Sequence, residues 1–319
     1  MVSNYRINSY ENIKTSVVSW LWYPYIPYGK ITLLQGDPGE GKTTLMLQIA
    51  ADITTGRKVP GGKIAAEPGN VIFQTAEDGL ADTIKPRLEQ AGADSSKVFY
   101  LEPIDNKELS LSDKRFEDAI IKKKTRLLII DPLQSFLETD SDMNKAGGMR
   151  KSFTKLSKIA ERTGCAVVII GHMNKGSGSK GIYRGLGSID IAAISRSVLL
   201  VGRDHNDPEI RAVVPIKTSL APEGSSYSFR LSKDEGFRWI GESDYTEDEL
   251  LGNISYGAKQ HKARTTLRLL LMKEDMPSRE VFEHMQALGI SKRTVELAKQ
   301  NMKIRAYKKQ NAWYWSIKN

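Results

Sequence analysis

Short apolar runs alternate with longer amphipathic stretches over the first 200 residues of the chain. Each run is bounded by turn-forming residues, which is typical of a strand buried on both faces of a parallel sheet. The runs cover residues 31–34, 71–75, 98–101, 127–131, 166–170 and 198–201. Helical patterns lie between them, from Thr44 onward and at residues 80–91, 116–124, 142–162 and 189–197. This alternation predicts an α/β fold with a mainly parallel sheet.

The pattern changes after residue 200. A strand at 213–216 precedes an expected β-hairpin with arms at 227–231 and 237–240. Beyond an acidic, glycine-containing stretch, the chain predicts a helix at 262–273, a second from Pro277 and a third capped by Ser291, and then a hairpin at 304–308 and 313–317. Three helices and a hairpin resemble a winged helix. We therefore expect a main domain at 1–245, a linker at 246–260 and a winged-helix-like domain at 261–319.

The residues after the first apolar run fit the pattern G-x-x-x-x-G-K-[ST]. Glycines let the backbone curl so that its N–H groups converge on phosphate oxygens. Lys42 supplies a charge to the β- and γ-phosphates, and the Thr43 hydroxyl can ligate Mg²⁺. A glycine turn with an accidental Lys-Thr is the alternative, but a strand precedes the loop and a helix follows it. We therefore expect ATP and Mg²⁺ to bind at Gly36, Asp37, Pro38, Gly39, Glu40, Gly41, Lys42, Thr43 and Thr44.

Two acidic residues follow other predicted strands. Asp131 ends a run of four bulky apolar residues, where a Walker B carboxylate would hold the Mg²⁺. The next residue is Pro132, so the base that activates water must come from another segment. Glu77 follows the strand at 71–75 and is the expected general base, with Asp78 as the alternative. Glu77 could instead be an ordinary solvent-facing loop acid, and a core strand that ends in Asp is common by chance.

His172 follows the run at 166–170 and would lie close to the γ-phosphate. It could donate a hydrogen bond to that phosphate and report its loss, or it could be satisfied by the backbone. The glycine-rich segment 174–188 leaves directly from this histidine. Its cations and single aromatic ring suit phosphate contact and base stacking, although a flexible linker would share this composition. The expected contacts with DNA here are Lys175, Lys180, Tyr183 and Arg184.

Charge is distributed unevenly along the chain. Residues 258–319 hold fourteen Lys and Arg against five Asp and Glu, which accounts for the whole net charge of +9. Such a segment indicates a polyanion partner, and we expect Lys292 and Arg293 at the start of the third helix to meet DNA. A protein-docking module with a basic face is the alternative.

Other features exclude some classes of protein. The single cysteine, Cys165, precedes an apolar run and is expected in the core, which excludes an internal disulfide framework. The N-terminus is polar where a signal peptide is apolar, and no apolar run approaches the roughly 18 residues of a membrane span. We therefore expect a cytoplasmic protein without a membrane segment.

Five segments, in this order along the chain, resemble the RecA-type ATPases. They are GDPGEGKTT (36–44), TAEDG (75–79), LLIIDPL (127–133), VVIIGHMNK (167–175) and residues 184–204. The resemblance is closest to the branch with the RepA-type plasmid replication helicase and many phage or mobile-element ATPases, and it covers roughly residues 15 to 250. It implies a RecA-like P-loop core, ATP-Mg²⁺ at a subunit interface and a homo-oligomeric ring, often a hexamer. It also implies a place for Arg87 near the phosphates.

The chain departs from related hexameric helicases at one position. Those proteins often reach a neighbour's γ-phosphate with Lys-x-Arg on a late strand, whereas this chain has Lys217-Thr218-Ser219. Lys217 is therefore the expected trans-acting cation, with Arg203 as the alternative. Two functions remain open: an ATP-driven helicase or translocase on single-stranded DNA, with possible duplex contact through the C-terminal domain, and an ATP-switched DNA-binding loader or regulator that does not unwind.

Overall fold

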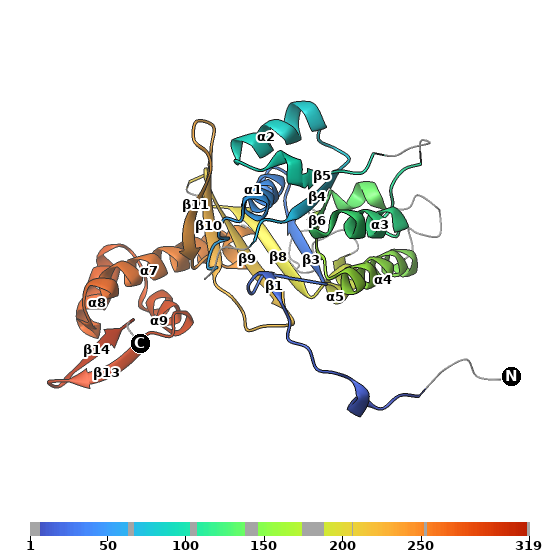
Figure 1. Ribbon diagram of the computed structural model, residues 1–319. Coiled ribbons are helices and arrows are strands. Elements are labelled where there is room, and N and C mark those ends of the chain that lie inside the picture. Colours follow the sequence, from blue (N-terminus) through green and yellow to red (C-terminus); the bar gives the residue numbers. More distant parts are fainter. Residues whose placement is uncertain are drawn as a thin grey trace.

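The computed structural model describes residues 7–62, 67–102, 107–137, 146–173, 188–205, 207–251 and 254–317. Within these ranges, nine strands form one sheet in the order β11-β10-β9-β8-β3-β7-β6-β4-β5. The six strands from β8 to β5 are parallel, and β9, β10 and β11 extend the sheet antiparallel. The predicted α/β fold with a mainly parallel sheet is therefore confirmed (Figure 1).

Each predicted strand of the sheet is present. Most of these strands are longer than the apolar runs from which they were predicted. The parallel strands are β3 (Ile31–Gly36), β4 (Asn70–Thr75), β5 (Val98–Phe99), β6 (Thr125–Asp131), β7 (Ala166–His172) and β8 (Ser197–Arg203). The antiparallel strands are β9 (Ile210–Thr218), β10 (Ser226–Ser232) and β11 (Gly236–Ser243). The expected hairpin is thus part of the central sheet, because β10 also pairs with β9.

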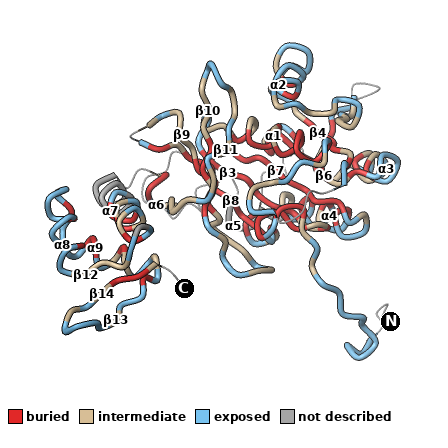
Figure 2. The backbone as a smooth tube through the Cα atoms, turned by 60° about the vertical axis from the view of Figure 1, so that its left-hand side comes forward, coloured by how far each residue is buried: buried red, intermediate tan, exposed pale blue. Residues whose placement is uncertain are grey.

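Helices cover both faces of the sheet. Alternate side chains of a strand point to opposite faces, so Leu127 and Ile129 pack in one core cluster while Leu128 and Ile130 pack in another. The first cluster contains side chains of α1 (Lys42–Thr55) and α2 (Lys85–Gln90), and the second those of α3 (Lys114–Lys123), α4 (Ala146–Thr163) and α5 (Ser188–Ile194). Figure 2 shows the buried strands between these helices. Cys165 is buried in the second cluster, as expected.

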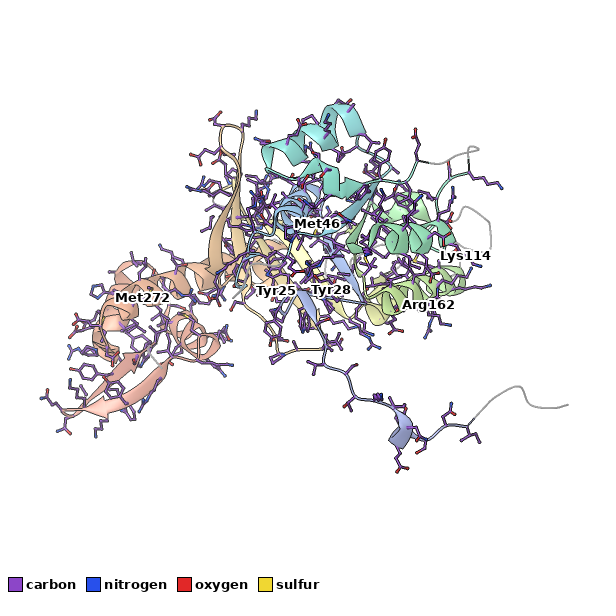
Figure 3. The ribbon with its side chains drawn as sticks, in the orientation of Figure 1. Tyr25, Tyr28, Met46, Lys114, Arg162 and Met272 are labelled. Carbon is purple, nitrogen blue, oxygen red and sulfur yellow. The ribbon has the colours of Figure 1, made fainter. Side chains whose placement is uncertain are left out.

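Aromatic side chains attach the chain's N-terminal part to the far end of the sheet. Trp22 and Tyr25 belong to a short two-stranded ribbon, and their rings contact those of Tyr227 and Trp239 on the β10–β11 hairpin. Met46 of α1 is buried in the same core cluster as Trp22 and Tyr25 (Figure 3).

The remaining short elements are the ribbon strands and single turns of helix. They are β1 (Trp20–Trp22), β2 (Ile26–Pro27), η1 (Tyr10–Asn12), η2 (Leu80–Ile84), η3 (Ser95–Lys97) and η4 (Leu133–Phe136).

The C-terminal residues form a separate small core. Its elements are α7 (Ile254–Lys273), β12 (Met276–Pro277), α8 (Ser278–Ala287), α9 (Lys292–Asn301), β13 (Arg305–Lys309) and β14 (Ala312–Ser316). Ser291 caps α9 by accepting a hydrogen bond from the Thr294 N–H, as its position predicted. Trp315 is buried in this core, whereas Trp313, two residues earlier on the same strand, is exposed. Figure 1 shows α7 leading away from the sheet to this unit.

The segment 246–260, expected to be a linker, is largely helical. A short helix, α6 (Glu247–Leu250), occupies its start, and α7 begins at Ile254. A capping box explains α6, because Glu249 accepts from the Thr246 N–H and the Thr246 side chain completes the pair. Glu249 also forms an ion pair with Arg264 of α7, and both side chains are only 5% exposed. The two units are therefore joined by a buried contact.

Among the helices that the structure describes, none is long and apolar enough to cross a membrane.

Candidate nucleotide site

Four strands bring the phosphate loop, Glu77, Asp131 and His172 to one edge of the sheet. Parallel strands end at the same edge, which is where open α/β sheets bind ligands. In the observed register, Gly36 at the end of β3 lies beside His172 at the end of β7. Thr75 at the end of β4 lies beside Asp131 at the end of β6, and Glu77 follows two residues later. The site is therefore assembled from segments that are far apart in the sequence.

The phosphate loop curls through two glycines in the left-handed region, Gly39 with φ 80° and Gly41 with φ 88°. Lys42 is buried, and its Nζ donates to the carbonyl oxygens of Gly36 and Asp37, both at 2.8 Å. Burial lowers the pKa of the Lys42 amine, and the nearby Asp131 opposes that shift. The ammonium thus lies inside the loop, where phosphate oxygens would be stronger partners than neutral carbonyl groups.

Thr43 and Asp131 face each other beside the loop. The Thr43 hydroxyl donates to Asp131 Oδ2 at 2.6 Å. Asp131 is 6% exposed, and this burial raises the pKa of its carboxyl to about 6, with smaller raising contributions from Asp78 and Glu77. A hydroxyl and a buried carboxylate are oxygen ligands of the kind that Mg²⁺ accepts alongside phosphates and water. The two residues therefore fit the ion that the sequence assigned to them.

Glu77 and His172 approach each other across the end of the sheet. The distance from His172 Nε2 to Glu77 Oε2 is 3.8 Å, which is too long for a hydrogen bond. Burial lowers the pKa of the His172 imidazole, and the charge of Lys42 lowers it further. The Glu77 side chain is 59% exposed and is thus accessible to a water molecule. Asp78, the alternative base, instead pairs with Arg87, with 3.6 Å between Oδ2 and Nη1.

A cavity of about 260 Å³ lies beside α1, the helix that follows the phosphate loop. It is bounded by α1, α2 and the turn between β10 and β11, and its lining includes Thr44, Gln48, Arg87, Gln90 and Phe237. Thr44 is the last residue of the loop motif, so the cavity adjoins the phosphate loop. The structure places Arg87 at this cavity.

The two candidate trans-acting cations lie at opposite edges of the sheet. Lys217 pairs with Val198 near the start of β8, and its Nζ donates to the carbonyl oxygens of Ala192 at 2.5 Å and Ser195 at 2.9 Å. It therefore lies away from the phosphate loop of its own chain. Arg203 ends β8 beside that loop, and its Nη2 donates to the Gly39 carbonyl oxygen at 3.1 Å. The sequence did not indicate this contact, because it depends on which strand neighbours β3.

The predicted contacts with DNA fall in two regions. Lys175, Lys180, Tyr183 and Arg184 lie outside the described residues. Lys292 and Arg293 are exposed in the first turn of α9, as the sequence predicted. Arg293 lines a groove of about 650 Å³ along α9 together with Lys299 and Lys303. The start of α9 therefore presents positive charge to solvent.

Comparison with known families matches residues 3–178 to the AAA domain family, which is more than half of the 319 residues. The chain belongs to the AAA domain family. Relatives of this AAA domain protein include the DNA repair protein RadA of Halalkalibacterium halodurans, of Bacillus subtilis and of Streptococcus pyogenes, which are 28%, 26% and 30% identical to it over 149 residues. These matches cover 46% of the chain and 28% of each relative's length. With its phosphate loop and sheet order, the chain has the core of a RecA-like ATPase.

Proposed function

We propose that this chain is an ATP-hydrolysing DNA motor that assembles into a ring and acts as a helicase or translocase on single-stranded DNA. The observation that carries the proposal is the convergence of Lys42, Thr43, Glu77, Asp131 and His172 at one sheet edge. The basic C-terminal segment supports a DNA partner, and so does the similarity to the DNA repair protein RadA. The replicative, RepA-like assignment rests on the sequence resemblance.

The chemistry follows from the positions of the side chains. Lys42 exchanges its two carbonyl partners for phosphate oxygens, and the loop N–H groups complete the cradle. Thr43 and Asp131 would hold Mg²⁺, which would neutralise charge on the phosphates. Glu77 orients a water molecule for attack on the γ-phosphate and accepts its proton. His172 lies between Glu77 and the loop, where it can sense whether the γ-phosphate is present.

In this proposal, the state of the γ-phosphate is coupled to DNA binding through His172. His172 ends β7, and the segment carrying Lys175, Lys180, Tyr183 and Arg184 follows it in the chain. A shift of the histidine on loss of the γ-phosphate would move that segment against the DNA backbone. Residues 261–319 would act as a winged-helix-like domain that contacts duplex DNA through Lys292 and other cations.

Ring formation would complete the site. Lys217 lies at the sheet edge away from its own loop, which supports an action on a neighbour's nucleotide. To act there, its amine must leave the carbonyl oxygens that now hold it at the end of α5. Hydrolysis that depends on a cation from a neighbour would begin only after assembly.

The second candidate function is an ATP-switched loader or regulator that binds DNA without unwinding it. One observation favours it: Leu250 of α6 packs in a cluster with Met173, the residue after His172. The same short helix holds Arg264 of α7 through Glu249. Contacts therefore run from the residue after His172 through α6 to the C-terminal unit, and a switch could use them.

One experiment distinguishes the two candidate functions. ATP turnover is measured with and without single-stranded DNA, alongside strand displacement on a forked duplex, with Glu77→Gln as the inactive control. A motor is expected to show DNA-stimulated turnover and displacement, both lost in the variant. DNA-stimulated turnover by an assembled ring without displacement contradicts the helicase and supports the switch.

A further inference from the structure

Two arginines and a glutamate form a charged cluster against the outer side of the phosphate loop. Arg203 Nη2 donates to the Gly39 carbonyl oxygen and lies 3.6 Å from Glu40 Oε1. Arg211 pairs with Arg203 across β8 and β9 and lies against the next glycine of the loop. A Cβ on Gly41 would lie 3.2 Å from Arg211 Cδ. Both cations therefore reach the phosphate loop of their own chain.

The strand end that carries Arg203 is held in place. A Cβ on Gly202 would meet the Leu250 Cβ at 2.7 Å, so α6 packs directly on the strand backbone. Asp204, the next residue, donates its N–H to the Ile210 carbonyl oxygen at 2.9 Å and accepts a hydrogen bond from the Tyr245 hydroxyl. Because these contacts hold the end of β8 in place, Arg203 can restrict the movement of the phosphate loop.

Some polar atoms of this charged cluster have no hydrogen-bond partner within it. Within the part of the chain that the structure describes, Arg203 Nε, Arg211 Nε and Glu40 Oε2 are buried without a hydrogen-bond partner. Burial raises the pKa of the Glu40 carboxyl, and the two arginines oppose that shift. Burial, and next the charge of Arg203, lower the pKa of Arg211. Maintaining two cations here has a cost in free energy, which suggests a role beyond packing.

The contact with Gly39 bears on phosphate binding through one peptide unit. The Gly39 carbonyl accepts from Arg203, and the same peptide carries the Glu40 N–H. The Glu40 N–H donates only a long hydrogen bond, with 3.4 Å between its nitrogen and the Asp37 carbonyl oxygen. A charged donor on the carbonyl polarises the peptide and strengthens its N–H as a donor. The loop amide is thus prepared to bind an anion.

We propose that Arg203, assisted by Arg211, is a positioning residue that holds the phosphate loop of its own chain ready for the nucleotide. The proposal rests on the proposed ATP site and deepens it. It gives Arg203 a role in cis, in contrast to the trans-acting role that the sequence left open for it. Arg203 does not touch the reacting atoms; it acts through Gly39 and Glu40.

Nucleotide binding and turnover test this role directly. Kd for a fluorescent Mg-ADP analogue, KM and kcat are measured for the full chain and for Arg203→Ala, Arg203→Lys and Arg238→Ala. Arg203→Ala should raise Kd and KM by about tenfold, as expected for loss of a hydrogen bond to a charged group, and change kcat less. Arg203→Lys should recover part of the loss because its amine can still donate to the carbonyl. Arg238 is exposed on β11, and its variant is the matched control.

Mixing variants separates the cis role from the trans role. Arg203→Ala chains are combined with Lys42→Ala chains, which keep Arg203 but lack the loop lysine, and turnover is measured at an ATP concentration below KM, where the raised KM of Arg203→Ala lowers the rate. A role in cis predicts no recovery of turnover, whereas recovery would show that Arg203 acts on a neighbour and would overturn the inference. Unchanged Kd and KM in Arg203→Ala would also overturn it, while the proposed ATP site would stand. Failure of the unmodified chain to bind nucleotide would overturn both.

Discussion

Asp131→Asn should stabilise the protein in the absence of Mg²⁺ and nucleotide while abolishing its response to them. The carboxyl group is buried, and its pKa rises from the usual 3.8 to about 6. A carboxyl whose pKa is raised by folding is costly to ionise in the folded state, so the native protein loses stability as the pH rises from below 4 to above 6. An uncharged amide of the same shape avoids this cost and can still accept from the Thr43 hydroxyl.

The size of the effect follows from the shift. Raising a pKa from 3.8 to about 6 corresponds to about 3 kcal/mol at pH 7.5, at about 1.4 kcal/mol for each pKa unit. The same relation leaves only about half of this cost at pH 5, because the group is then mostly protonated in the folded protein. For a domain of this size, about 3 kcal/mol corresponds to a rise in Tm of roughly 5 to 10 °C.

Thermal unfolding of the two proteins is compared at pH 5 and pH 7.5 in EDTA, then with Mg-ADP. The variant should have the higher Tm in EDTA, by a larger margin at pH 7.5. Mg-ADP should raise the Tm of the unmodified protein only. Asp118→Asn, at an exposed carboxylate on α3, is the matched control and should leave Tm unchanged at both values of pH. A variant that is less stable in EDTA, or a margin that does not change with pH, would refute the argument.

Three further variants test other parts of the account. Glu77→Gln should retain Mg-ATP binding and lose turnover by about 100-fold or more, measured by phosphate release, and normal turnover would place the base elsewhere. Glu249→Met should destabilise the protein by roughly 3 to 5 kcal/mol in urea because the Arg264 charge is left buried, and adding Arg264→Met should restore much of that loss. Lys292→Ala with Arg293→Ala should weaken duplex binding and reduce the slope of log affinity against log salt by about 2, whereas unchanged binding would indicate a protein-docking surface.

The sequence was informative wherever local pattern determines structure. Strands β3, β6 and β7 follow from short apolar runs, because burial on both faces requires continuous apolar residues. The start of α7 was missed because the stretch ISYGAKQ has neither helical apolar spacing nor a clear cap before it. The helix is instead joined to α6 further along by the Glu249–Arg264 pair, which no local pattern reveals. A truncation before Ala258 would therefore cut α7 rather than remove a separate tail.

The same limit applies to the candidate site. The phosphate loop, Glu77, Asp131 and His172 could be predicted because each follows a strand of a parallel sheet, and parallel strands end together. The position of Arg203 at the loop and of Lys217 at the far edge depends on β8 lying next to β3 and β9 running antiparallel to it. Strand order is set by pairings between distant segments, so the spacing of residues does not encode it.

The rate of phosphate release from ATP, measured with and without single-stranded DNA for the unmodified chain and for Glu77→Gln, tests the central proposal most directly. We expect slow release without DNA, at least about tenfold stimulation by DNA, and little release by the variant under either condition. No release by the unmodified chain, or a rate that neither DNA nor the variant changes, would contradict it.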